Sequence, residues 1–128
     1  MIVAGIGCRK GTTALEIDAA IDAALAEAGQ PREALGAIAT SDGKGSEPGI
    51  IEAVAGRGLS LLLVKPGDLE AAGPRTQSSS PRVKELFGVA SVAEAAALAA
   101  AGPASKLIVA RIVVGPATCA LAAADGEA

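Results

Sequence analysis

The sequence contains no histidine, tryptophan or tyrosine and only one phenylalanine, and this shortage excludes several classes of function. Proteins that bind single-stranded nucleic acids commonly stack the bases on aromatic side chains, which are almost missing here. Structural zinc sites need about four cysteine or histidine ligands, and the chain offers only Cys8 and Cys119. A cysteine–histidine nucleophile is excluded because the chain has no histidine to act as the base. We therefore expect no metal, no cofactor and no nucleic-acid partner.

Positive charge and long apolar runs are also in short supply. The net charge is −3 and the isoelectric point is about 4.9, so the chain lacks the basic surface typical of proteins that bind DNA or RNA. Its apolar runs are far shorter than the roughly 20 residues that span a bilayer. The chain begins with a short apolar stretch that precedes a basic pair, which is the reverse of a secretory leader. These features predict a cytoplasmic protein with reduced thiols and no membrane partner.

What the sequence does contain is small aliphatic residues, arranged in a regular succession of elements. Hydrophobic residues make up 51% of the chain, and its 128 residues predict one domain over 1–128. Strands are expected over residues 2–6, 35–40, 59–64, 107–114 and 118–123, and helices over residues 14–28, 47–55, 66–71, 81–87 and 92–102. A Gly115–Pro116 turn should join the last two strands as a hairpin. This order predicts an α/β fold, a three-layer α/β/α sandwich with a mixed, mostly parallel five-stranded sheet.

Four helix starts carry capping signals, one of them Ser80 before Pro81 at the start of the helix expected over residues 81–87. Thr13 with Glu16 and Ser91 with Glu94 have the spacing of a capping box, in which each side chain bonds the other residue's backbone amide. Ser46 is expected to cap the helix that has Glu47 and Pro48 in its first turn.

The glycine-rich stretch GIGCRKGT, residues 5–12, resembles a nucleotide-binding loop but departs from both common patterns. A P-loop places glycine before lysine, whereas Lys10 precedes Gly11 here, and the dinucleotide pattern has one residue fewer between its last two glycines. Exposed backbone amides beside Arg9 and Lys10 suit carboxylates or phosphates. The alternative, a tight turn with solvated cations, stays open. Cys8 lies in this cationic loop, which predicts a lowered thiol pKa, whereas Cys119 is expected in the core.

A second polar loop, ATSDGKGSE at residues 39–47, follows the second expected strand. Ligands of open α/β sheets collect at the carboxyl ends of strands. This loop therefore suits either substrate clamping and acid–base chemistry or an ordinary polar turn. The segment SVAEAAALAAAG, residues 91–102, is interpreted mainly as a structural helix, with a ligand at its amino end as the alternative.

The motifs GIGCRKGT, ATSDGKGSE and SVAEAAAL, in this order, resemble the CobE/CbiG C-terminal domain family of cobalamin biosynthesis, and the closing GPATCALA also fits. The resemblance implies an α/β/α domain that acts on or binds a corrin precursor around precorrin-5. A free-standing domain of this kind resembles the aerobic-branch members. Three roles stay open, namely binding of a precorrin, hydrolysis of a cobalt-precorrin lactone with release of acetaldehyde, and support of a pathway methyltransferase or another pathway enzyme.

Carried over residue by residue, the resemblance implies a substrate-binding set but no catalytic residue. The set consists of Gly7, Cys8, Arg9, Lys10, Gly11, Thr12, Thr40, Asp42, Lys44, Glu47, Ser80, Ser91 and Glu94. Arg111 stands where many relatives have lysine. In the hydrolase hypothesis, Asp42 or Glu47 would activate water and Lys44 or Arg9 would stabilise the oxyanion.

Overall fold

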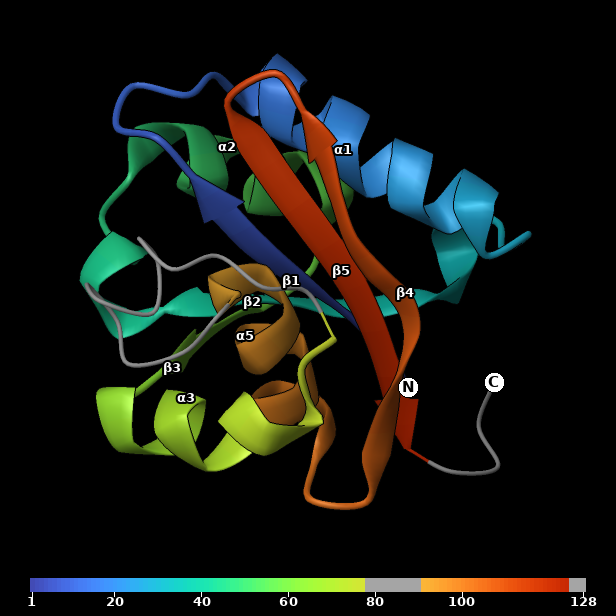
Figure 1. Cartoon of the computed structure of the whole chain (residues 1–128). Helices are drawn as coiled ribbons and strands as arrows, with labels where there is room; N and C mark the ends of the chain where they lie inside the picture. Colours follow the sequence, from blue (N-terminus) through green and yellow to red (C-terminus); the bar gives the residue numbers. More distant parts are fainter. Residues whose placement is uncertain (78–90, 125–128) are drawn as a thin grey trace.

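A mixed five-stranded sheet forms the centre of the molecule (Figure 1). The structure, a computed structural model, describes residues 1–77 and 91–124, so the helix expected over residues 81–87 lies outside the described residues. The strands are β1 (Ile2–Cys8), β2 (Leu35–Ser41), β3 (Leu61–Val64), β4 (Ser105–Val114) and β5 (Ala117–Ala124). Their order across the sheet is β3-β2-β1-β5-β4, which places β1 in the middle.

Strand direction confirms the expected mixed sheet. β1 pairs with β2 and β2 with β3 in parallel, whereas β5 pairs antiparallel with both β1 and β4. Of the strands in the described part of the chain, β5 alone therefore runs in the opposite direction to the others. Because β5 has two neighbours, the sheet has two parallel and two antiparallel strand pairs. The last two strands form the expected hairpin, with Gly115 at a positive φ of 58° in the turn.

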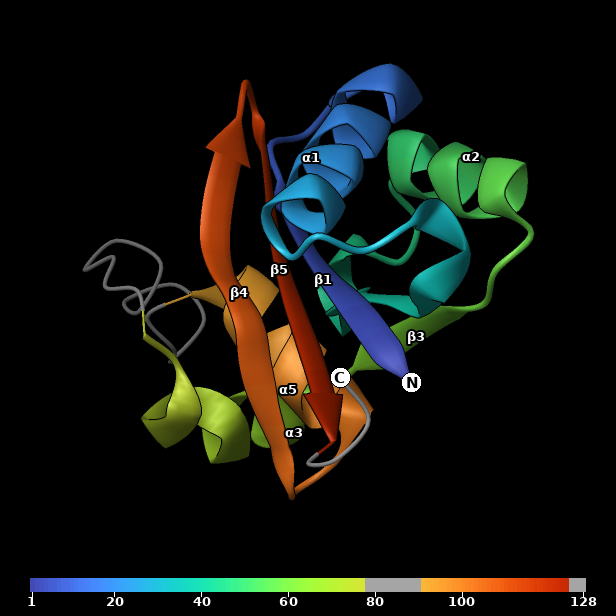
Figure 2. The same ribbon diagram turned by 90° about the vertical axis from the view of Figure 1, so that its right-hand side faces the viewer.

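Helices cover both faces of the sheet, as the three-layer prediction requires (Figures 1 and 2). The helices are α1 (Ala14–Glu27), α2 (Pro48–Arg57), α3 (Pro66–Ala72) and α5 (Val92–Ala101), and single 3-10 turns occupy Arg32–Ala34, Asp42–Lys44 and Gly73–Arg75. Helices α1 and α2 pack on one face, and α3 and α5 pack on the other. Within the described ranges, no helix is long and apolar enough to cross a membrane.

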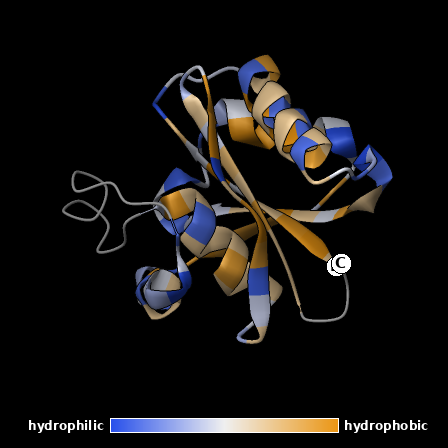
Figure 3. Ribbon diagram, turned by 45° about the vertical axis from the view of Figure 1, so that its right-hand side comes forward, coloured by the Kyte–Doolittle hydropathy of each residue, from blue (hydrophilic) through white to orange (hydrophobic). Residues whose placement is uncertain are grey.

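The two faces of the sheet are packed by different side chains. Isoleucine and leucine dominate the core under α1 and α2, whereas alanine dominates the core under α5. Apolar colours prevail on the strands, whereas the helices show apolar and hydrophilic colours side by side (Figure 3). The small side chains let α5 approach the sheet so closely that a Cβ atom added at Gly5 would overlap the Ala93 carbonyl oxygen. Gly5 is thus a packing position within β1, which extends two residues beyond its expected end.

The helix starts follow the capping predictions in part. Thr13 and Glu16 form the complete expected box, with Thr13 N donating to Glu16 Oε1 at 3.0 Å and Glu16 N donating to Thr13 Oγ1 at 3.2 Å. The predicted Ser46 cap is wrong, because Glu47 is the N-cap residue of α2 and makes no side-chain capping bond. The Ile50 N–H, which a side-chain cap would satisfy, instead donates to the Glu47 carbonyl at 3.1 Å.

Candidate functional site

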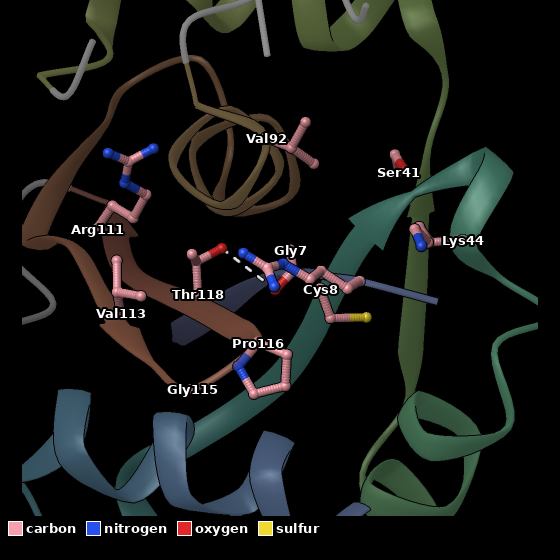
Figure 4. Close-up of a pocket in the computed structure, with 11 residues that line it drawn as sticks. Gly7, Cys8, Ser41, Lys44, Val92, Arg111, Val113, Gly115, Pro116 and Thr118 are labelled. Carbon is pink, nitrogen blue, oxygen red and sulfur yellow. Dashed lines mark hydrogen bonds between the residues drawn. The ribbon is translucent and has the colours of Figure 1, made fainter. Parts of the chain in front are cut away.

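A cleft of about 250 Å³ opens at the carboxyl ends of β1 and β2, beside the β4–β5 turn and the amino end of α5 (Figure 4). Its lining residues come from four stretches of the chain and are Gly7, Cys8, Arg9, Ser41, Lys44, Val92, Arg111, Val113, Gly115, Pro116 and Thr118. This is the edge at which ligands of open α/β sheets bind.

The floor of the cleft is kept open by Gly7, near the end of β1. A Cβ atom at this position would lie 2.7 Å from Thr118 Oγ1 on the neighbouring strand. Thr118 Oγ1 instead donates to the Gly7 carbonyl at 3.2 Å. Beside it, Arg9 N donates to the Pro116 carbonyl at 3.1 Å, which fixes the start of the first loop against the β4–β5 turn. These two bonds join the end of β1 to the β4–β5 hairpin beside the cleft.

The charged side chains that line the cleft, among the described residues, are all positive. Arg9, Lys44 and Arg111 line it, and within residues 1–77 and 91–124 no acidic side chain belongs to the lining. Helix α5 begins at Val92 in the cleft wall, and the amino end of a helix adds partial positive charge. The arrangement attracts anions, and two guanidinium groups can each bind a carboxylate through two parallel hydrogen bonds.

Arg111 is positioned by a carboxylate buried beneath it. Glu94 has no exposed surface, and its Oε2 accepts a hydrogen bond from Arg111 N at 2.7 Å. Its Oε1 accepts from Gln77 N at 2.6 Å. Ser91 Oγ accepts from Glu94 N at 3.2 Å, which is one half of the predicted capping box. The Glu94 side chain, however, bonds the backbone of two distant segments, because β4 passes directly beside α5. Glu94 therefore does not face the cleft.

Glu47 and Thr12 hold the first two loops in place. Gly11, at a positive φ of 83°, donates its backbone N–H to Glu47 Oε1 at 2.8 Å. Thr12 Oγ1 donates to the Arg9 carbonyl at 2.6 Å. The two polar loops thus meet through a bond between residues 36 positions apart. Glu47 is occupied by this bond and is not among the residues that line the cleft.

The Cys8 thiol lies in the cleft wall, but its predicted activation is wrong. Burial of the half-buried side chain raises the Cys8 pKa above its ordinary value. Nearby Lys44 and a hydrogen bond with Thr12 act in the opposite direction, and Glu47 reinforces the rise. Since the thiolate is the nucleophile, Cys8 is mostly a neutral thiol at neutral pH.

The structure separates the expected site residues into two groups. Gly7, Cys8, Arg9 and Lys44 come together in the cleft. The other described members of the set are not among its lining residues. Thr40 is buried and donates to the Ile6 carbonyl at 2.8 Å, Lys10 and Asp42 are exposed, and Ser91 is buried at the start of α5. Ser80 lies outside the described residues.

Several lining residues were outside the expected set. Arg111 interrupts the apolar run KLIVARIVV, and a lone cation in such a strand is a signal that the sequence does carry. Ser41 sits directly beside Thr40 and Asp42 and has no distinguishing local pattern. Thr118, Val113 and Pro116 come from the closing hairpin, which only the strand order brings beside β1.

Comparisons with known proteins agree with this architecture. A family model described as cobalamin synthesis G C-terminus matches residues 2–122. The protein CobE of Sinorhizobium sp is 37% identical over 121 residues, which cover 94% of this chain and 79% of that protein. The cobalt-precorrin-5A hydrolase of Priestia megaterium is 29% identical over 102 residues, 80% of this chain but only 27% of the hydrolase.

A solved structure extends the likeness to three dimensions. The crystal structure of CobE, described as a protein from the cobalamin (vitamin B12) biosynthetic pathway, superposes with a TM-score of 0.89 at 36% sequence identity. The match covers 95% of this chain and 89% of that one. All the residues that line the cleft fall within the segment matched by the family model.

Proposed function

The chain belongs to the CbiG C-terminal family and is a CobE/CbiG-like protein of cobalamin biosynthesis, and we propose that it binds a mid-pathway corrin precursor through the precursor's carboxylates. Corrin precursors carry acetate and propionate side chains around the ring. The precursor is one close to precorrin-5, in the aerobic branch of the pathway. Binding, with transfer to or from other pathway enzymes, is the role that the site supports best.

The observation that carries this proposal is a cleft whose lining, in the part of the chain that the structure describes, has three cations and no acidic side chain. A protein of net charge −3 has concentrated positive charge at one edge of its sheet. Guanidinium groups match carboxylates in shape as well as charge. Arg9, in the loop after β1, and Arg111, in β4, approach the cleft from different parts of the fold, which suits a ligand that carries several carboxylates.

The size of the cleft indicates which part of the ligand enters it. Pockets that enclose a drug-sized molecule have volumes of about 300–1,000 Å³, and this cleft has about 250 Å³. It admits a side chain or one edge of a macrocycle. The rest of the ring would lie across the mouth against aliphatic surface such as Val92, Pro116 and the 64% exposed Val113. Aliphatic contacts of this kind replace the aromatic stacking that the composition does not allow.

Binding of a corrin with free carboxylates tests the proposal. We expect saturable binding of the polyacid and no comparable binding of the same corrin as its neutral methyl ester. Arg111→Ala and Arg9→Ala should each weaken binding about tenfold or more, because each removes a charge-assisted hydrogen bond. Arg32→Ala, at the opposite end of the sheet, is the charge-matched control.

Two further outcomes are decisive. Expression together with the pathway enzymes should yield purified protein with the visible absorbance of a bound tetrapyrrole. Equal affinity for the acid and the ester, or equal affinity in the cleft variants and the control, would contradict recognition through carboxylates.

Hydrolysis of a precorrin lactone is a second candidate, favoured by the 29% identity with a cobalt-precorrin-5A hydrolase. The geometry favours binding instead, because the two carboxylates proposed as bases are exposed or bonded elsewhere. Asp42 is exposed and lies outside the cleft lining, and Glu47 accepts from Gly11 N. Release of acetaldehyde from a lactone-bearing cobalt-precorrin by the purified protein would support hydrolysis, and its absence would leave binding as the function.

A further inference from the structure

Resting on the proposed function, we propose that Ser41 and Lys44 form a subsite at one end of the cleft that binds a single ligand carboxylate and distinguishes it from an amide or ester. The Ser41 hydroxyl donates to one carboxylate oxygen, and the Lys44 ammonium neutralises the charge. The two residues belong to the second polar loop, three positions apart, and both line the cleft.

The Ser41 hydroxyl is buried and has no hydrogen-bond partner among the described residues. Ser41 ends β2 with 4% of its surface exposed. Its Oγ is the one buried side-chain oxygen or nitrogen, among the described residues, that makes no hydrogen bond. It does not cap the following 3-10 turn. A buried hydroxyl without a partner destabilises a protein, so its position facing the cleft indicates that a ligand supplies the missing acceptor.

The neighbouring residue, Thr40, shows that a hydroxyl buried at this end of β2 can find a hydrogen-bond partner within the protein. Thr40 is fully buried, and its hydroxyl donates to the Ile6 carbonyl at 2.8 Å. Successive residues of a strand point to opposite faces of the sheet. Thr40 therefore points away from the cleft, where the β1 backbone is available, and Ser41 points toward the α5 side, where the cleft takes the place of a protein acceptor.

Lys44 supplies the charge that the hydroxyl lacks. It is half-buried at the end of the 3-10 turn Asp42–Lys44 and makes no ion pair within residues 1–77 and 91–124. Figure 4 shows Ser41 and Lys44 together at one side of the cleft, with Arg111 and Thr118 at the other. One carboxylate can thus bind at the Ser41 end while another reaches Arg111.

This pair of groups favours a carboxylate over its neutral derivatives. A carboxamide or ester keeps an acceptor oxygen for Ser41 but leaves the Lys44 charge without a counter-ion in a half-buried place. Sites built around such pairing reject the analogue that leaves a charged group unpaired. The subsite therefore selects ligands that are not amidated or esterified at this position.

The first arm of the test needs no ligand and compares Ser41→Ala with Ser46→Ala, an exposed serine in the same loop. Ser41→Ala should unfold at a denaturant midpoint no lower than that of the wild-type protein, because it removes an unpartnered buried hydroxyl. A clear loss of stability specific to Ser41→Ala would show that the hydroxyl is bonded within the protein, and would overturn the proposal.

The second arm uses sodium propionate and records amide chemical shifts. We expect saturable shifts at residues 41–44 in the wild-type protein. The affinity for propionate that they report should be about tenfold lower in Ser41→Ala and in Lys44→Met. Lys106→Met, at the far end of β4, is the charge-matched control. Shifts that are missing from residues 41–44, or that persist unchanged in both variants, would overturn the subsite.

The third arm uses the corrin polyacid and separates the subsite from the function on which it rests. Affinity about tenfold lower in Ser41→Ala and Lys44→Met supports the subsite. Unchanged affinity in both variants overturns the subsite and leaves the proposed function standing. If the wild-type protein binds propionate at residues 41–44 but no corrin, the proposed function fails while the carboxylate subsite remains.

Discussion

At the scale of single residues, burial rather than neighbouring charge sets the behaviour of both cysteines. Cys119 lies in the middle of β5 with no exposed surface. Burial raises its pKa to about 12, although the positive charge of Arg57 acts in the opposite direction. At Cys8, burial likewise outweighs the cation beside it. The basic pair that follows Cys8 in the sequence therefore says little about the thiol, because the proton equilibrium depends on how much water reaches the sulfur.

We predict that the Cys119 thiol makes stability depend on pH in the alkaline range. An exposed thiol in the unfolded chain titrates near pH 9, whereas the native thiol titrates at about pH 12. The native protein then holds a proton that the unfolded chain has lost, so this stabilising contribution is complete below pH 9 and declines as pH rises toward 12. The slope approaches about 1.4 kcal/mol per pH unit.

The measurement is the free energy of unfolding by urea between pH 8 and pH 11, for the wild-type protein and for Cys119→Ala. The variant should lose stability less steeply above pH 9, whatever its stability at pH 8. Parallel pH profiles would contradict a buried, protonated Cys119.

At the scale of elements, the close approach of α5 to β1 builds one wall of the cleft. Gly5 permits this approach because it has no Cβ atom to meet the Ala93 carbonyl oxygen. Gly56 offers the opposite case, since a Cβ atom added there in α2 would contact nothing within 4 Å. Packing therefore requires a glycine at position 5 but not at position 56, and the two positions can be compared by the same substitution.

Gly5→Ala should therefore destabilise the protein by about 3 kcal/mol or more, as overpacking against a fixed backbone does. Gly56→Ala should stabilise it by about 0.5–1 kcal/mol, because alanine favours the helix. Urea unfolding of both variants measures the difference. Similar small effects at the two positions would show that α5 does not pack against β1 as described.

Glu94 joins α5 to β4 and to the segment after α3, and we predict that Glu94→Gln loosens at least one of these connections. A glutamine has one acceptor oxygen in place of two, so one of the backbone donors, Gln77 N or Arg111 N, loses its partner. The loss of a charge-assisted hydrogen bond should cost about 1.5–3 kcal/mol.

Amide hydrogen exchange at Gln77 and Arg111 reports this change directly, and exchange at the α1 amides serves as the internal control. Faster exchange at one or both positions is expected, together with weaker corrin binding because Arg111 is less well positioned. Unchanged exchange at both amides would contradict the role of Glu94 as the link.

At the scale of the whole molecule, charge is distributed unevenly. The net charge of −3 would repel a polyanionic ligand if it were spread evenly over the surface. The cleft nevertheless gathers Arg9, Lys44 and Arg111 at one edge of the sheet. Interactions within about 10 Å dominate at an ionic strength of 0.1 M. The local cations therefore determine the interaction with a bound anion.

We predict that the dissociation constant of the corrin polyacid rises as sodium chloride is increased from 50 to 500 mM, because salt screens the attraction in the cleft. Isothermal titration at each salt concentration measures the trend, and the Arg9→Ala variant should show a shallower dependence. Tighter binding at higher salt would show that the net negative charge, rather than the cleft, governs association.

The sequence by itself determined the elements and the general kind of fold. Each depends on neighbours within a few positions along the chain, as in the Thr13–Glu16 capping box and the Gly115–Pro116 turn, both present in the structure. The alternation of elements was enough to predict a mixed sheet between two helical layers. The ordered motifs also indicated the family, because they extend over nearly the whole chain.

Only the tertiary structure decided which polar groups meet. Ser91 and Glu94 have the same local spacing as Thr13 and Glu16, yet Glu94 bonds Gln77 and Arg111 because β4 passes beside α5. The cations of the cleft come from positions 9, 44 and 111 and meet because β1 lies between β2 and β5. Strand order follows from long-range packing, which a local pattern does not encode, and burial of Ser41 and Cys8 follows from that packing in turn.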